Sequence, residues 1–174
     1  MDRIRGSLDR AVAKGKLEAA AREAALGRLQ TTTDFDALAG CDLVIEAIVE
    51  NLEEKLRTFA ALAKVVRPEA IFASNTSSLT ITQLAAASGR PGRTIGLHFF
   101  NPVPVMQLVE VVRTILSDKT VVAAATEFCR ALGKEPIACR DNSGFIVNRL
   151  LVPYLLDAIR ALEEGVGTLE EIDK

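Results

Sequence analysis

The chain has few of the residues that mark secreted, metal-binding or membrane proteins. Its only cysteines are Cys41, Cys129 and Cys139, which form no CxxC motif and no Cys/His ligand spacing. An odd number of cysteines inside apolar segments indicates reduced thiols, so we expect neither a disulfide framework nor a metal site. No apolar run approaches the roughly 20 residues of a membrane span, and the charged amphipathic start lacks the apolar stretch of a signal peptide. We therefore expect a cytoplasmic protein that does not enter a membrane, with any targeting segment lying outside these residues.

Charge of either sign is not in excess. The chain has 21 Lys and Arg residues against 23 Asp and Glu residues, a net charge of −2, and 49% hydrophobic residues. This balance argues against a disordered chain and against a basic nucleic-acid-binding protein. At 174 residues, the chain is long enough for one good core, or for one domain and part of a second.

A glycine-rich phosphate-binding turn is also missing. Doubly wound dinucleotide-binding domains open with a strand, a GxGxxG turn and a helix whose amino end binds the pyrophosphate. The nearest string, "GVGTLE" from Gly165, lacks the third glycine and follows a helical stretch rather than a strand. We therefore expect no complete dinucleotide site within these residues.

What is present is an alternation of strands and helices after a helical start. Residues 2–29 are rich in Ala, Leu, Lys, Arg and Glu, and Gly15 divides them into a helical hairpin. Continuous Val/Ile/Leu runs bounded by helices then predict a mostly parallel, doubly wound α/β sheet. The expected strands are 42–48, 70–74, 94–100, 107–112 and 136–139, and the expected helices are 51–66, 80–87 and 119–132.

The pattern changes near residue 140. Residues 144–165 read as one long helix that Pro153 is expected to kink, and "TLEEIDK" reads as the start of another helix. We therefore expect one domain over residues 1–140, and an all-helical domain over 141–174 that is cut short.

The single histidine ends an apolar run in "IGLHFFNPVPVM". A lone histidine in this position usually fills a strand, unless partners that chemistry needs lie nearby. Glu110 in "LVEVV" is expensive to bury unpaired, so if the two strands are neighbours its carboxylate can bond His98 and leave the other ring nitrogen for a substrate proton. The alternatives are a structural ion pair, or a glutamate on an edge strand that faces solvent.

Polar residues in two further segments are candidates for the same cleft. In "ASNTSSLTITQLA", Thr80 and Gln83 have the spacing of a capping box, which leaves Ser77 free for a ligand beyond the strand end. Asn148 in "GFIVNRL" follows three apolar residues on the long helix, where an amide on the protein surface is the ordinary interpretation, and alone it says little about function.

Taken together, "DLVIEAIVENLEEK", "FASNTSSL", "IGLHFFNPVPVMQLVEVV" and "GFIVNRL" resemble the 3-hydroxyacyl-CoA dehydrogenase family over essentially the whole chain. The resemblance implies a partial Rossmann-like sheet, followed by the start of a helical dimerisation domain. It also implies truncation at both ends relative to the family. The implied activity is the NAD-dependent oxidation of an L-3-hydroxyacyl-CoA to the 3-ketoacyl-CoA, or the reverse, in a protein that is a homodimer when complete.

The resemblance also assigns roles. His98 is implied as the catalytic base and Glu110 as its support, while Ser77 and Asn148 hold the oxygens of the substrate. The residues implied to contact NAD are Ala47, Glu50, Lys55, Ser77 and Asn101, and those implied to contact coenzyme A are Ser7 and Lys14.

Two other interpretations stay open at this stage. One is a non-catalytic fragment that at most binds coenzyme A or a partner subunit. The other is a sugar-acid dehydrogenase, because such enzymes share the His-Phe-Phe-Asn-Pro region. In either case we expect residues 1–174 alone to be inactive, because the pyrophosphate-binding turn is missing. The sequence leaves the acyl chain length, the direction of reaction and the choice between NAD and NADP undefined.

Overall fold

A computed structural model describes all of residues 1–174, which form two compact units, Met1–Ala37 and Leu38–Lys174. The smaller unit is a pair of helices, α1 (Asp2–Ala13) and α2 (Ala19–Gly27). Gly15 lies between them with a φ of 65°, a left-handed conformation that glycine adopts without steric cost. Arg22 of α2 donates a 2.6 Å hydrogen bond to Asp9 of α1. The predicted helical hairpin is therefore confirmed.

The larger unit contains every expected strand and helix, with bounds that differ from the expected ones by at most three residues. Its strands are β1 (Leu43–Glu46), β2 (Ile71–Ser74), β3 (Thr94–Phe99), β4 (Leu108–Arg113) and β5 (Glu135–Arg140). Its α-helices are α3 (Leu52–Val65), α4 (Ile81–Ala87), α5 (Lys119–Ala131), α6 (Val147–Glu163) and α7 (Leu169–Ile172). Two short 3-10 helices, η1 (Phe35–Leu38) and η2 (Pro91–Arg93), precede β1 and β3.

The five strands form one sheet in the order β1-β2-β3-β4-β5. All neighbouring pairs are parallel except β3 and β4, which are antiparallel. The segment between β3 and β4 is too short for the crossover of about a dozen residues that a parallel connection needs, so the chain turns back on itself. The predicted mostly parallel α/β sheet is confirmed, and the one antiparallel pair sets His98 opposite Glu110.

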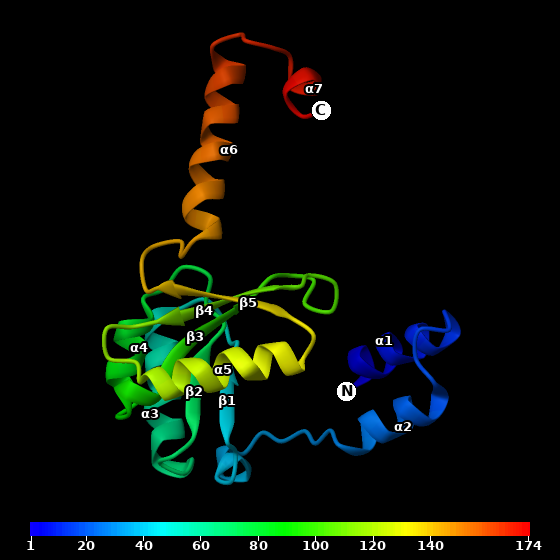
Figure 1. The fold of residues 1–174 in the computed structure, drawn as a ribbon, viewed down its shortest axis with the longest axis vertical. Helices are drawn as coiled ribbons and strands as arrows, with labels where there is room; N and C mark the ends of the chain where they lie inside the picture. The colour runs from blue at the N-terminus through cyan, green and yellow to red at the C-terminus, as the bar shows by residue number, and fades with distance from the viewer. The chain divides into compact units, whose positions relative to one another are not determined.

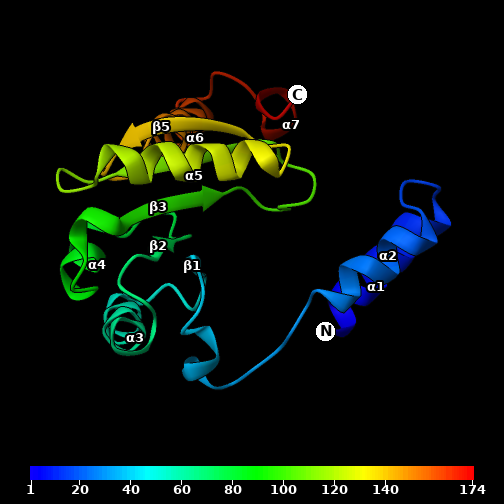
Figure 2. The same cartoon turned by 60° about the horizontal axis from the view of Figure 1, so that its bottom comes forward.

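Helices cover both faces of the sheet (Figures 1 and 2): α3 and α4 lie on one face, and α5 lies on the other. Side chains alternate between the faces along each strand. In β4, Val111 packs in the core beneath α5, while Val112 packs in the core that α3 and α4 complete. Both cores are closed: Phe72 on one side and Leu97 on the other have no exposed surface.

The start of α4 is capped by a residue from the far end of the sheet. Asp141, which follows β5, accepts hydrogen bonds from the backbone N–H groups of Ile81 (3.0 Å) and Thr82 (2.7 Å). The predicted capping box at Thr80 is wrong, because the Thr80 side chain makes no capping bond. A carboxylate is a stronger acceptor than a hydroxyl for these N–H groups, and its position 59 residues away in the chain hides it from local sequence patterns.

The last two helices extend from the end of the sheet (Figure 1). α6 contains Pro153 and has no buried residue, although it is rich in leucine. Thr168 and Glu171 form a capping box at the start of α7, which confirms the helix predicted in "TLEEIDK". No helix in the structure combines the length and apolar character needed to cross a bilayer.

Close packing in the sheet predicts a cost for adding a single methyl group at Gly96. A Cβ atom there would lie 2.8 Å from Val112 Cβ and 3.0 Å from Ile81 Cδ1. Overpacking of this kind costs about 1–3 kcal/mol, so we expect Gly96→Ala to lower the free energy of unfolding in urea by that amount. Gly40→Ala is the matched control, because its Cβ meets no atom within 4 Å. Equal unfolding midpoints for the two variants would show that the sheet and α4 are less tightly packed than described.

Candidate functional site

The lone histidine lies near the carboxyl end of β3 and is only 6% exposed. Its Nδ1 atom is 2.7 Å from Oε2 of Glu110, the residue directly opposite on β4. The expected pairing of His98 with Glu110 is therefore confirmed. Glu110 has no exposed surface, which rules out the alternative of an edge glutamate facing solvent.

The second oxygen of Glu110 is also used. Oε1 accepts hydrogen bonds from the backbone N–H groups of Ile146 (2.9 Å) and Val147 (3.0 Å), at the start of α6. Two N–H donors on one oxygen stabilise the ionised carboxylate, which can only accept hydrogen bonds. With an ionised carboxylate as acceptor, the donor in the contact is the imidazole Nδ1–H.

Two aromatic rings flank the imidazole. The centroid of the Phe100 ring is 4.5 Å from that of His98, and the centroid of the Phe145 ring is 5.6 Å away. Phe145 has a φ of 49°, an uncommon conformation for a residue with a side chain, and it follows Gly144, whose φ is 74°. Gly144 and Phe145 turn the chain immediately before the N–H groups of Ile146 and Val147, which bond Glu110. The strained backbone therefore lies next to the contact between Glu110 and His98.

The other ring nitrogen of His98, Nε2, makes no hydrogen bond within the protein and is not sealed from solvent. A neutral imidazole with Nδ1–H bonded to a carboxylate presents a lone pair at Nε2. It can therefore take up a proton from a ligand, and Glu110 stabilises the resulting imidazolium. The geometry is that of an oriented general base.

Asn148 and Ser77 lie beside this pair. Asn148 is half-buried one residue after Val147, and its Nδ2 atom donates a 3.3 Å hydrogen bond to the carbonyl of Ser77. Asn148 is therefore not the fully exposed surface amide that would be the ordinary expectation from the sequence. Hydrogen bonds and the start of α6 connect His98, Glu110, Asn148 and Ser77 in one group.

A second buried ion pair lies at the end of β1, and sequence analysis missed half of it. The Nζ atom of Lys55, which is 1% exposed, is 2.7 Å from Oε1 of Glu46, which is 4% exposed. Ser74 at the end of β2 donates a 2.7 Å hydrogen bond to the other oxygen of Glu46. The sequence does contain a hint of this pair, because Glu46 ends an apolar strand and lies nine residues before Lys55. The two side chains meet only because α3 packs on the sheet.

Lys55 links this pair to Glu50, whose Oε2 atom is 3.3 Å from Nζ. Oε1 of Glu50 accepts hydrogen bonds from the Thr76 hydroxyl and from the Ser77 N–H. Burial by itself raises the pKa of Glu50, but the hydrogen bonds from Thr76 and Lys55 outweigh it and hold this pKa below its ordinary value. Glu50 is therefore charged at neutral pH, and 41% of its side chain is exposed.

Two other residues implied by the family resemblance, Ala47 and Asn101, make no side-chain hydrogen bond within the protein. Ala47 is exposed directly after β1, and Asn101 is exposed in the loop after β3. Neighbouring Asn75, which sequence analysis did not single out, accepts a 2.9 Å hydrogen bond from the Phe99 N–H and so joins the ends of β2 and β3. Glu50, Lys55, Ser77 and the His98–Glu110 pair thus lie at the carboxyl ends of β1, β2 and β3, with Ala47 and Asn101 in the loops beyond.

Ser7 and Lys14 belong to the other unit, and both are exposed at α1 and its end. All three cysteines are free. Burial, assisted by the charges of Glu110 and Asp141, raises the pKa of Cys139 to about 11, so this thiol stays protonated beside the site.

An α/β sheet covered by helices on both faces, with a base at the carboxyl ends of its strands, is the architecture of Rossmann-type dehydrogenases. Residues 1–142 match the family model "3-hydroxyacyl-CoA dehydrogenase, NAD binding domain", and residues 144–174 match the C-terminal domain of the same family. The chain belongs to the 3-hydroxyacyl-CoA dehydrogenase family.

Individual relatives agree with this assignment. The chain is 52% identical over 175 residues to the 3-hydroxybutyryl-CoA dehydrogenase of Mycobacterium tuberculosis, covering 99% of this chain and 61% of the relative. It is 49% identical to a probable 3-hydroxybutyryl-CoA dehydrogenase of Deinococcus radiodurans, covering 99% and 63%. Among solved structures, the (S)-3-hydroxybutyryl-CoA dehydrogenase of Ralstonia eutropha matches with a TM-score of 0.95 and 43% identity, covering 98% of this chain and 60% of that one. The chain therefore spans about three fifths of the length of these relatives.

The buried Glu46–Lys55 pair predicts a large effect on stability. Lys55→Met removes the cation and leaves the Glu46 carboxylate buried without it, and breaking a buried pair in this way costs about 3–5 kcal/mol. We expect urea unfolding at pH 7 to show a loss of that size, and we expect the double variant Glu46→Gln/Lys55→Met to recover much of it.

The matched control is Asp157→Asn, which breaks an exposed pair with Arg160. Its cost should stay below about 1 kcal/mol. A loss for Lys55→Met as small as that of the control would mean that Lys55 is not the buried partner of Glu46.

Proposed function

We propose that the chain is part of an NAD-dependent dehydrogenase that oxidises the 3-hydroxyl group of an L-3-hydroxyacyl-CoA to a ketone, or catalyses the reverse reduction. The observation that carries this proposal is the imidazole of His98, held through Nδ1 by Glu110 and open at Nε2. In the oxidation, Nε2 takes the proton of the substrate hydroxyl while Glu110 stabilises the positive charge on the ring. In the reduction, the same nitrogen returns the proton.

Ser77 and Asn148 have the neutral donors that suit an oxygen gaining negative charge. The hydrogen bond from the Asn148 amide to the Ser77 carbonyl sets the two residues side by side at the start of α6. We infer that the Ser77 hydroxyl and the second amide hydrogen of Asn148 orient the substrate oxygens toward His98.

The residues at the ends of β1 and β2 fit the nicotinamide half of NAD. Glu50 presents a charged, partly exposed carboxylate suited to ribose hydroxyls, and the neighbouring Ile48 and Val49 expose apolar surface (42% and 67%) suited to a ring. These residues would hold that half of NAD, which would supply the acceptor for the hydride leaving the carbon that carries the hydroxyl. Ala47 and Asn101 complete the edge of this site. Lys55 is buried, so its part is to hold Glu50 in place.

Coenzyme A is assigned to the helical hairpin. Ser7 and Lys14 are seven residues apart, and hence on one face of a helix, and both are exposed, so they can reach phosphate groups.

The remaining proposals concern the whole protein. A domain boundary near residue 140 is supported by the meeting point of the two family models at residues 142 and 144. A homodimer is supported by the apolar side chains that α6 leaves exposed, among them Leu150 (69%) and Tyr154 (70%). The free thiols support a cytoplasmic location.

The experiment compares residues 1–174 alone with a chimera that adds, at both ends, the corresponding segments of the Mycobacterium tuberculosis relative. The chimera should oxidise NADH when given acetoacetyl-CoA, and His98→Gln in the chimera should lower kcat about 100-fold to 10,000-fold, the usual effect of losing a general base. Residues 1–174 alone should show no turnover, because they contain no Gly-rich turn for the pyrophosphate.

Arg160→Gln, a change in an exposed residue of α6, is the control for general effects of substitution. A His98→Gln chimera as fast as its parent would refute the assignment of the base. Activity on a free hydroxy acid but not on the coenzyme A ester would favour a sugar-acid dehydrogenase, and an inactive but folded chimera would favour a non-catalytic chain.

A further inference from the structure

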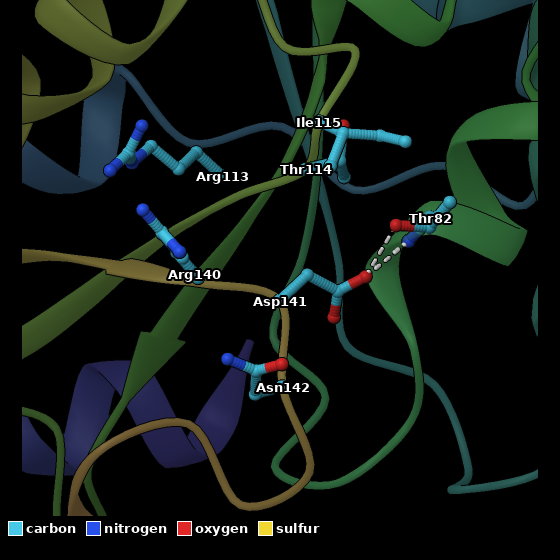
Figure 3. Close-up of a pocket in the computed structure, with 7 residues that line it drawn as sticks. All are labelled: Thr82, Arg113, Thr114, Ile115, Arg140, Asp141 and Asn142. Atoms are coloured by element: carbon cyan, nitrogen blue, oxygen red, sulfur yellow. Dashed lines mark hydrogen bonds between the residues drawn. The ribbon is translucent and has the colours of Figure 1, made fainter.

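A polar hollow lies beside the carboxyl ends of β4 and β5, away from His98. It has a volume of about 460 Å³, and Figure 3 shows its lining side chains: Thr82, Arg113, Thr114, Ile115, Arg140, Asp141 and Asn142. Because β4 runs antiparallel to β3, its last residue lies near the start of β3, whereas His98 lies near the end of β3. The hollow is therefore separate from the site proposed for the dehydrogenase reaction.

Two arginines stand side by side in this hollow. Arg113 ends β4, Arg140 ends β5, and the two are register partners on parallel strands, so their side chains leave the same face of the sheet. Figure 3 shows both side chains on the same side of the hollow. Both are exposed, and neither forms an ion pair or a side-chain hydrogen bond within the protein. Like charges in such a position repel each other, and a bound anion would relieve that repulsion.

The acidic residues nearby form no ion pair with either arginine. Asp141 accepts bonds from Ile81 N–H on one oxygen, and from Thr82 N–H and the Thr82 hydroxyl (2.6 Å) on the other. Figure 3 shows this carboxylate turned toward Thr82. Asp118, before α5, makes no ion pair with either arginine.

The surroundings add a third cation and an apolar contact. Lys119 lines an adjoining hollow that also includes Arg113, and it too has no acidic partner. Ile115, in the loop after β4, is 92% exposed at the rim of both hollows. An apolar side chain next to a group of cations suits a ligand that has an anionic end and an organic part.

We propose that Arg113 and Arg140 form a binding site for a phosphate group, with Ile115 positioned to contact the organic part of a phosphate monoester. Two planar guanidinium groups match the oxygens of a phosphate dianion, each through paired N–H donors. Lys119 adds charge without fixed geometry. This site does not depend on the proposed dehydrogenase function, since it shares no residue with it.

Residues 1–174 are titrated with inorganic phosphate and, separately, with phenyl phosphate. Binding is measured by calorimetry and by the width of the ³¹P NMR line. Both probes should bind, and Arg113→Gln and Arg140→Gln should each weaken binding roughly tenfold, the loss expected for a charge-assisted, bidentate contact. Added NaCl should weaken binding in the parent and much less in either variant. Arg130→Gln is the matched control, because Arg130 is an exposed arginine on α5 that pairs with Glu127.

The two probes distinguish the sources of the phosphate group. If phenyl phosphate binds more tightly than inorganic phosphate, and Ile115→Ser removes the difference, the ligand is a phosphate ester. If the two affinities are equal and unchanged in Ile115→Ser, the ligand is free phosphate. Circular dichroism and urea unfolding verify that each variant is folded. Absence of binding at millimolar phosphate, or binding that is unchanged in both arginine variants, contradicts the proposal.

Discussion

The contact between His98 and Glu110 is the constraint on which the site depends. A carboxylate with no exposed surface is tolerated only because the imidazole and two backbone N–H groups bond its oxygens. Those three donors come from β3 and from the start of α6, so the same interaction joins the sheet to the segment that carries Asn148. The buried carboxylate thus fixes the orientation of the imidazole that is proposed as the base.

Glu46 plays a corresponding part at the end of β1. It is buried, and its bonds from Lys55 and Ser74 hold together α3 and the ends of β1 and β2. Through Lys55, the bonding extends to Glu50 and on to the loop that contains Ser77. Two buried carboxylates therefore organise the carboxyl ends of β1, β2 and β3. Glu110 orients the imidazole proposed to transfer the proton, and Glu46, through Lys55, orients the residues proposed to hold the cofactor.

Much of this could be predicted from the sequence, because the relevant patterns are local. Apolar runs between helices predicted the sheet, and a charged residue among valines predicted a partner for Glu110. Contacts that depend on how separate elements pack were not predictable in this way: Asp141 caps α4 from the end of β5, and Lys55 reaches Glu46 only because α3 packs on the sheet. The left-handed conformation of Phe145 also has no local signature, since only its surroundings enforce it.

Because His98 is the only histidine in the chain, the position of its ring proton can be measured directly. In residues 1–174 labelled with ¹⁵N at histidine, a single imidazole gives the two ring-nitrogen signals. We expect the neutral ring to carry its proton on Nδ1, with Nε2 at the chemical shift of an unprotonated nitrogen. A neutral ring protonated on Nε2 would contradict this expectation, because the lone pair would then face Glu110 and no base would be available to a substrate.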